Sequence, residues 1–261
     1  QEWAGEGLWR VIEENYDAVC IYGEAAVFDT VREYDFPPAV AAKSVYVGYL
    51  PKYNGLLSRE SVARELDLDG RPLVVVTAGG GEDGFAIFDH YLAGLERGHG
   101  PEGVQHCLVT GPGMPEVDRE RLRLRAERPD VRFHVFSNHM TSLFAAADVV
   151  VTMGGYNSLM EVVSLHRRVV VVPRVVPRSE QLIRAERLAA RGLVRLVHPD
   201  AMLAGGLMDA VIEELHRPAG AARQGLQFDG YEGIRRELAL LAPMNAHPSA
   251  FERSGRGRVR A

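Results

Sequence analysis

The feature that most limits the fold of this chain is a regular alternation between short apolar runs and longer amphipathic segments. From Arg71 onward, runs rich in valine, such as 73–77 (LVVVT), are each followed by a segment with helical spacing. In the first of these segments Phe88, Leu92 and Leu95 fall on one helical face. Unbroken apolar strands are buried on both faces, and strands that alternate with helices run parallel. The sequence therefore predicts an α/β fold with a doubly wound, Rossmann-like parallel sheet. The predicted strands are 73–77, 105–110, 131–135, 148–152, 169–172 and 193–197.

Two further apolar runs, 17–22 and 45–50, precede this pattern and are separated by the break at Pro37-Pro38. We expect them to be the remnant of a second Rossmann-like domain. The first residues enter a helix-like pattern directly, without an initiator methionine, so we expect the chain to begin partway through a longer protein. The predicted organisation is a remnant and crossover at 1–50, an α/β domain at 51–228, and a terminal helix with a disordered basic tail at 229–261.

Composition excludes several classes of function. The formal net charge is −5, which implies no general nucleic-acid partner. No apolar run approaches the roughly 18 residues that a transmembrane helix requires. Cys20 and Cys107 lie in no CxxC or Cys/His pattern, and the histidines form no metal-spaced cluster. We therefore expect reduced thiols in a cytoplasmic protein that has no metal site.

In open α/β sheets, ligands bind outside the carboxyl ends of the strands, and the first candidate site follows the first predicted strand. Gly79, Gly80, Gly81 and the following Gly84 lie between a strand and a helix, where backbone N–H groups can approach a pyrophosphate. Alone this match is weak. No acidic residue closes the second strand, and no Lys-Ser/Thr pair follows, so neither a dinucleotide site nor a P-loop is indicated. The alternative is a tight turn that needs glycine only for its geometry.

The second candidate is the segment TMGGYNSLME. Gly154 and Gly155 separate a buried strand from a helix whose start carries Asn157 and Ser158. Free N–H groups, an amide and a hydroxyl there can bind a diphosphate. Glu161, about one turn further on, can accept hydrogen bonds from a ribose diol. The alternative is that Asn157 or Ser158 merely caps the helix while Glu161 favours the helix dipole.

The third candidate is the loop and helix start PRVVPRSEQLIR. Arg174 and Arg178 suit phosphate oxygens because planar guanidinium groups donate in pairs. Glu180 and Gln181 open the next helix and can hydrogen-bond the ribose or a donor-sugar hydroxyl. An Arg–Glu surface pair with an ordinary first helical turn is the alternative. Arg184 is expected to be a solvated helix residue.

The fourth candidate is the segment FSNHM, in which Phe136, Ser137 and Met140 can form a wall for a nucleobase. The base would rest on the apolar side chains and use backbone groups near Ser137. His139 is a lone loop histidine, for which a role as base or ligand is the weaker interpretation.

Taken in order, these motifs resemble a known family. Residues 71–216 look like the C-terminal domain of GT-B glycosyltransferases related to the MurG-type N-acetylglucosaminyltransferases, and the first 50 residues resemble the end of the N-terminal domain in a bacterial group of that superfamily. The resemblance implies a UDP-sugar or related donor and no bound metal. It maps the diphosphate to Gly79–Gly81, Gly154, Gly155, Asn157 and Ser158, the ribose to Glu161, a further donor contact to Gln181, and the base to Phe136, Ser137 and Met140.

The resemblance also implies that the acceptor site, and commonly the catalytic base, belongs to the N-terminal domain. This chain carries at most the last strand or two of that domain, so no catalytic residue is named. The predicted function is transfer of a hexosyl or N-acetylhexosaminyl group from a nucleotide-diphosphate sugar to an unknown acceptor. This chain would be the donor-binding part, incomplete for catalysis, and its partner would be the missing N-terminal domain or a separate acceptor-domain chain.

Two other functions stay open. A sugar-nucleotide epimerase of the same fold would need acid and base groups in the cleft, for which the sequence offers Glu161, Glu180 and His139. A non-catalytic, donor-binding subunit of a split glycosyltransferase would need a second chain that supplies the acceptor site.

Overall fold

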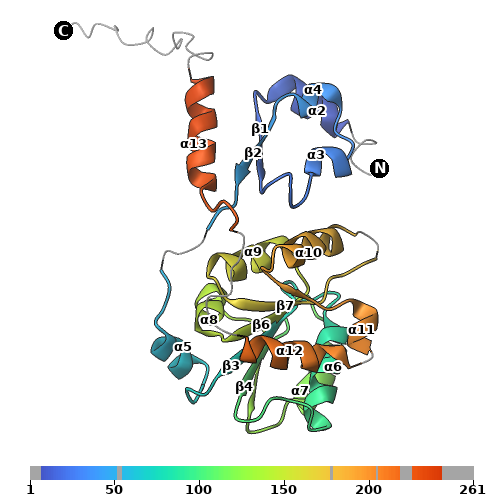
Figure 1. The fold of residues 1–261 in the computed structure, drawn as a ribbon, viewed down its shortest axis with the longest axis vertical. Helices are drawn as coiled ribbons and strands as arrows, with labels where there is room; N and C mark the ends of the chain where they lie inside the picture. Colours follow the sequence, from blue (N-terminus) through green and yellow to red (C-terminus); the bar gives the residue numbers. More distant parts are fainter. Residues whose placement is uncertain (1–6, 52–54, 177–178, 204, 218–224, 243–261) are drawn as a thin grey trace, which may run out of the picture.

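A six-stranded parallel sheet forms the larger part of the molecule (Figure 1). The structure, a computed structural model, describes residues 7–51, 55–176, 179–203, 205–217 and 225–242. The strands are β3 (Leu73–Thr77), β4 (Gln105–Val109), β5 (Val131–His134), β6 (Val149–Thr152), β7 (Arg168–Val171) and β8 (Arg195–Leu196). Their order is β5-β4-β3-β6-β7-β8, and every pairing is parallel. The predicted doubly wound sheet is confirmed.

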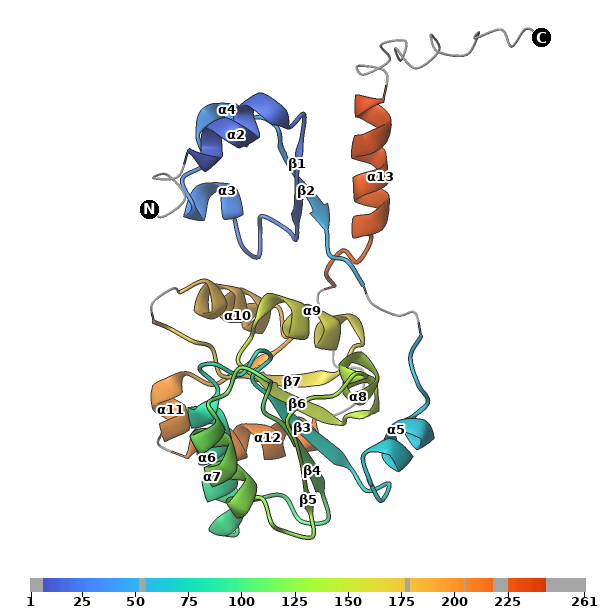
Figure 2. The ribbon, with the colours of Figure 1, turned by 180° about the vertical axis from the view of Figure 1, so that it is seen from behind.

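Both faces of this sheet are covered by helices, as the unbroken valine runs require. Val75 and Val150 face one hydrophobic cluster, whereas Val74 and Val149 face the other, and all four are fully buried. The first cluster is covered by α5 (Arg59–Glu65), α8 (Met140–Ala146), α9 (Tyr156–Ser164) and α10 (Glu180–Ala190). The second is covered by α6 (Phe85–Glu96), α7 (Glu116–Arg125), α11 (Pro199–Leu203) and α12 (Gly206–His216). Figure 2 shows these two helical layers from behind.

The strand order reverses direction between β3 and β6. The chain steps outward from β3 to β4 and β5, then returns to the other side of β3 with β6, where Thr77 pairs with Thr152. The loops after these two strands therefore diverge to opposite faces of the sheet. Such a switch point is where open α/β sheets bind ligands. It lies between the two glycine-rich segments that the sequence singles out.

A smaller unit lies over helices α9 and α10 (Figure 1). Its two strands, β1 (Val19–Tyr22) and β2 (Ser44–Gly48), pair in parallel, and three short helices accompany them: α2 (Leu8–Asn15), α3 (Thr30–Glu33) and α4 (Pro38–Ala41). The last described helix, α13 (Gly230–Leu241), returns to this unit and packs on β2. We call residues 7–48, which contain β1, β2, α2–α4 and the loops between them, the N-terminal unit.

The chain crosses between the two units twice, and the two crossing segments pair with each other. The Tyr49 N–H donates to the Gln227 carbonyl at 2.8 Å, and the Gly230 N–H donates to the Tyr49 carbonyl at 3.0 Å. A side chain on Gly233 would collide with the backbone of Val47, so the close approach of α13 to β2 requires glycine there.

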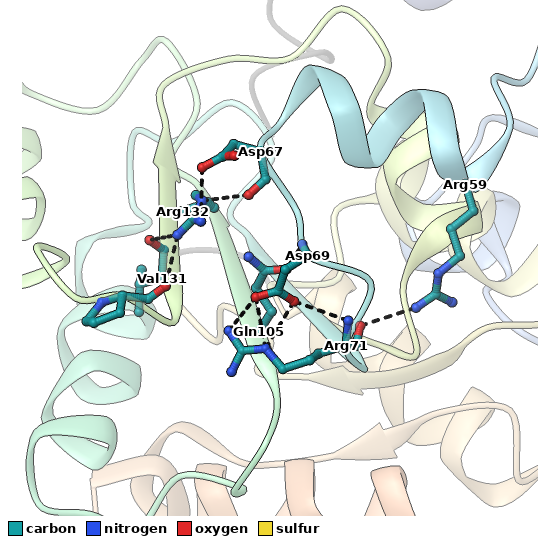
Figure 3. A network of polar contacts seen from close by, with 8 residues as sticks. Arg59, Asp67, Asp69, Arg71, Gln105, Val131 and Arg132 are labelled. Carbon is teal, nitrogen blue, oxygen red and sulfur yellow. Dashed lines mark hydrogen bonds and ion pairs between the residues drawn. The ribbon is translucent and has the colours of Figure 1, made fainter.

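The amino edge of the large sheet is tied to α5 and to the loop that follows this helix by a polar network (Figure 3). Arg59 pairs with Asp148 at 3.2 Å, and the Asp69 N–H donates to the Gln105 side chain at 2.9 Å. Sequence periodicity missed α4, α5 and α11, because helices of four, seven and five residues are too short to show a repeated apolar spacing. The predicted disordered tail, residues 243–261, lies outside the described residues.

Within the described part of the chain, no helix is long and apolar enough to cross a membrane. Cys20 and Cys107 are both free thiols. Burial of Cys107 raises the pKa of its thiol to about 12, as expected for a cysteine inside a strand.

Candidate functional site

The glycine loop after β3 interlocks with the loop after β4. Gly79, Gly81 and Gly111 have left-handed backbones with φ of 69°, 98° and 91°. A side chain on Gly111 would collide with the Gly79 carbonyl, and the Gly113 N–H donates to the Gly80 carbonyl at 2.8 Å. At Gly79 and Gly81 the turn geometry alone therefore demands glycine. Gly80 is different: its φ is not left-handed, and a Cβ there would meet no atom within 4 Å.

The start of α9 lies beside this loop and is left open. Gly155 is the N-cap, and no side chain of the described residues caps the helix. The alternative that Asn157 or Ser158 caps the helix is wrong, because both lie inside its first turn. A Cβ on Gly79 would lie 3.6 Å from the Ser158 hydroxyl oxygen, so the two glycine-rich segments adjoin each other. Uncapped N–H groups carry the positive end of the helix dipole and can bind an anion.

Gly154 and Gly155 serve different purposes in this turn. Gly154 has a φ of 80°, and a Cβ there would lie 2.8 Å from Cγ1 of Val171 on the neighbouring strand. Gly155 has an ordinary φ of −54°, and a Cβ there would meet nothing within 4 Å. Gly154 is thus needed for the backbone, whereas Gly155, like Gly80, borders open space.

Glu161 lies further along α9 and is joined to the helix after β5. The Thr141 hydroxyl donates to Glu161 Oε2 at 2.9 Å, and Thr141 is in the first turn of α8. This contact brings the predicted base wall toward the predicted ribose ligand. In that wall Phe136 is 60% exposed, whereas Ser137 is buried and accepts from the His139 N–H at 3.2 Å. Met140 is partly buried and packs against the hydrophobic cluster below the loop, so only part of its side chain remains exposed to contact a base.

Arg174 lies in the loop after β7 and joins two other parts of the site. Its guanidinium forms an ion pair with Asp83, which follows the glycine loop of β3. Its backbone N–H donates to Gln181 Oε1 at 3.0 Å. Arg174 therefore lies at the predicted edge of the sheet, but its guanidinium is paired with Asp83. To neutralise the negative charge of a ligand, the guanidinium would have to leave Asp83. Arg178 lies outside the described residues.

Glu180 and Arg184 depart most from expectation. The prediction that Arg184 is solvated is wrong, because the residue is only 4% exposed. It forms an ion pair with Glu180, its Nη1 donates to the Gly154 carbonyl at 3.4 Å, and its guanidinium lies over the rings of Phe28 and Tyr156 at 5.6 and 5.4 Å. Sequence reasoning missed it because Phe28 belongs to the N-terminal unit, which covers this part of α10. The i,i+4 spacing of Glu180 and Arg184 was the one local signal.

Burial of the Tyr156 ring at the start of α9 raises the pKa of its hydroxyl to about 12, and the nearby Arg184 opposes that rise. The site therefore presents a buried cation, a neutral phenol and an uncapped helix start on one side of the switch point. Among the described residues, no three His, Cys, Asp or Glu side chains gather as a metal-binding group.

Comparison with known proteins assigns this arrangement to a family. The description "Glycosyltransferase family 28 C-terminal domain" matches residues 74–225, more than half of the chain. The chain belongs to glycosyltransferase family 28. The matched range of this family 28 chain contains the six-stranded sheet, apart from Leu73 at the start of β3, and the predicted donor-contact residues.

Two curated relatives of this family 28 chain carry the same name, "UDP-N-acetylglucosamine--N-acetylmuramyl-(pentapeptide) pyrophosphoryl-undecaprenol N-acetylglucosamine transferase". That of Opitutus terrae is 29% identical over 147 residues, which cover 52% of this chain and 38% of the relative. That of Rubrobacter xylanophilus is 31% identical over 159 residues, which cover 60% of this chain and 44% of the relative. The matched part thus spans less than half the length of these relatives.

Solved structures share the fold of this family 28 chain. MurG of Acinetobacter baumannii superposes with a TM-score of 0.55 at 15% identity, over 91% of this chain and 72% of that one. The calicheamicin glycosyltransferase CalG4 superposes with a TM-score of 0.54 at 16% identity, over 91% of this chain and 51% of that one. The GT-B fold expected from the resemblance is confirmed.

Proposed function

We propose that this chain binds the nucleotide-diphosphate sugar of a glycosyltransferase, with a UDP-sugar as the favoured donor. The observation that carries the proposal is the open junction at the switch point. There the uncapped start of α9 adjoins the glycine loop of β3, and two glycines, Gly80 and Gly155, border empty space without any backbone need for glycine. A bound ligand would need this room at both positions, and at Gly155 the N-cap preference for glycine acts in the same direction. The named activity of the curated relatives, which use UDP-N-acetylglucosamine, favours the uridine nucleotide.

The diphosphate would lie against the backbone at Gly80 and Gly155 and accept from the N–H groups of the first turn of α9. Asn157 is exposed in that turn and can add its amide, and Ser158 can add its hydroxyl. Glu161, steadied by Thr141, would accept from the ribose hydroxyls. The base would lie over Phe136 near the backbone of Ser137.

The sugar attached to this diphosphate would lie toward α10. Glu180 and Gln181 open that helix at the neighbouring strand tip, and Arg184 joins Glu180 to the carbonyl that precedes the α9 cap. A carboxylate and an amide oxygen at this place can accept from sugar hydroxyls. The contact between Gln181 and the Arg174 backbone fixes the position of the amide.

In the proposed reaction an acceptor hydroxyl forms a bond to the anomeric carbon while the bond from that carbon to the β-phosphate oxygen breaks. The leaving nucleoside diphosphate gains negative charge, which the α9 N–H groups are oriented to stabilise. A base must take the acceptor proton, and none is assigned to this chain. We place the base and the acceptor site in a further N-terminal domain or a separate chain, because the matched part covers less than half of the relatives.

Isothermal titration of the chain with UDP, GDP and dTDP tests the proposal. UDP is expected to bind most tightly of the three. Glu161→Gln should lower the affinity for UDP, because the amide side chain offers one acceptor oxygen in place of two. Glu186→Gln, on the exposed side of α10, is the matched control and should bind as the wild type does. Lack of binding to all three nucleotides at millimolar concentration would overturn the proposal.

The same material separates the two other functions. Inversion of the donor sugar without any acceptor would identify an epimerase. In the structure its three candidate groups have separate partners: Glu161 contacts Thr141, Glu180 contacts Arg184, and His139 lies 3.9 Å from Glu65. Activity that appears only on addition of a second, acceptor-binding chain would identify a subunit of a split enzyme.

A further inference from the structure

The N-terminal unit places a tyrosine hydroxyl on the carboxylate that the donor sugar is proposed to use. Tyr34 donates to Glu180 Oε2 at 2.7 Å, across 146 residues of sequence. The other oxygen, Oε1, accepts from Arg184. Both oxygens of Glu180 are thus engaged before any sugar is present, and a phenolic O–H stands where a sugar O–H would donate.

Tyr34 is held in this position by its own unit. It follows α3, whose N-cap Asp29 accepts from the Arg32 N–H at 3.2 Å and from the Tyr46 hydroxyl at 2.9 Å. Its ring meets the ring of Phe28 edge-on at a centroid distance of 6.1 Å. The hydroxyl is therefore presented by a fixed turn, which lowers the entropy lost on making the contact.

Attachment of the N-terminal unit does not depend on Tyr34. Glu24 forms an ion pair with Arg191 at 3.0 Å, and its other oxygen accepts from the Gln227 N–H at 2.8 Å. Tyr49 stacks on Tyr156 with centroids 6.3 Å apart. These contacts lie at the same boundary between the units and would remain if the Tyr34 hydroxyl moved away.

We propose that Tyr34 is an internal competitor for Glu180, which closes the sugar subsite in the ligand-free protein and lowers the affinity for nucleotide sugars but not for nucleotides. This inference rests on the proposed donor-binding function and adds a residue of the N-terminal unit to it. A sugar hydroxyl that binds Glu180 must displace the Tyr34 hydroxyl. The hydrogen bond lost from Tyr34 offsets part of the free energy gained from the new hydrogen bond to the sugar. A nucleoside diphosphate without a sugar leaves the contact intact.

Titration of the wild type and of Tyr34→Phe with UDP and with UDP-N-acetylglucosamine tests the competition. The Kd for UDP-N-acetylglucosamine should fall about tenfold in the variant, the usual worth of one hydrogen bond to a charged group, while the Kd for UDP stays unchanged. In a Glu180→Gln background the effect of Tyr34→Phe should shrink, because the two changes remove the same contact.

Tyr91→Phe is the matched control, since it removes a phenol contact, 2.9 Å to His106, inside the opposite helical layer. It should leave both affinities unchanged. A weaker affinity of Tyr34→Phe for UDP-N-acetylglucosamine would show that Tyr34 holds the sugar rather than competes with it. Equal affinities in wild type and variant would also overturn the inference. If UDP itself fails to bind the wild type, the donor-site proposal fails, and this inference fails with it.

Discussion

Alanine substitutions at Gly80 and Gly155 test whether a ligand, and not the backbone, requires glycine at these two positions. Neither residue has a left-handed φ, and a Cβ at either meets no atom within 4 Å. At such a position alanine stabilises the fold by about 0.4–1 kcal/mol, because it restricts the unfolded chain. Gly80→Ala should therefore raise Tm by about 1–4 °C. At Gly155 the loss of a favourable N-cap residue offsets that gain, so the stability should change by less than about 0.5 kcal/mol.

Binding should respond in the opposite direction. Each new methyl group would occupy the space proposed for the diphosphate and move it away from the N–H groups of α9. We expect the affinity for UDP to fall at least about tenfold, or about 1.4 kcal/mol, in either variant. Calorimetric titration measures the affinity, and thermal unfolding measures the stability of the same samples.

Gly225→Ala is the matched control, because Gly225 also has an open Cβ position without a left-handed φ but lies outside the glycine loops. Gly225→Ala should change the free energy of unfolding by no more than about 1 kcal/mol, and the affinity for UDP should stay unchanged. Unchanged UDP affinity in Gly80→Ala and Gly155→Ala, with folded and stable proteins, would refute the reasoning that a diphosphate lies against these two residues.

Three further results are expected. Gly111→Ala combines a φ of 91° with a collision at the Gly79 carbonyl, so it should lower the unfolding free energy in urea by about 2 kcal/mol or more; wild-type stability would contradict the interlocked loops. Arg184→Met removes the cationic partner of Glu180, whose side chain is 33% exposed and keeps its contact with Tyr34, and should cost about 1–3 kcal/mol in the same assay, whereas Arg187→Met on the exposed side should cost little. Burial lowers the pKa of His106 from 6.5 to about 4, so the imidazole binds a proton more tightly in the unfolded chain than in the folded one. The free energy of unfolding should therefore be unaffected by this group above about pH 7 and fall by up to about 3 kcal/mol as the pH drops toward 4. His106→Gln should reduce this loss in a pH series of urea unfolding.

The sheet could be predicted from the sequence because its signal is local. Each valine run is long enough to define a strand, and the rule that ligands bind at carboxyl ends places Gly79–Gly81 and Gly154–Ser158 together without knowledge of the pairing. The structure then adds the strand order, which makes β3 and β6 neighbours. β8 marks the limit of this approach: the strand contains Arg195 and Leu196, with one further hydrogen bond from the Val197 N–H to β7, whereas the predicted strand is 193–197.

The partners of Arg184 and Glu180 could not be predicted, since they depend on contacts between distant segments. Tyr34 and Phe28 belong to a different unit, and nothing in the spacing of α10 indicates that its first turns are covered. In the same way, the pairing of Arg174 with Asp83 joins two loops 91 residues apart in sequence. The sequence indicates which chemical groups are near the site, whereas the free or paired state of each charge depends on the tertiary fold.

The return of α13 to β2 sets an order on biosynthesis. The large sheet and its helices are continuous in sequence, so that domain can fold as soon as its last helix has been made. β2 is synthesised early, but the helix that packs on it begins only at Gly230. During translation one side of the small sheet must therefore remain uncovered until α13 has left the ribosome, and the slowest, least local step in assembly is expected to be this docking.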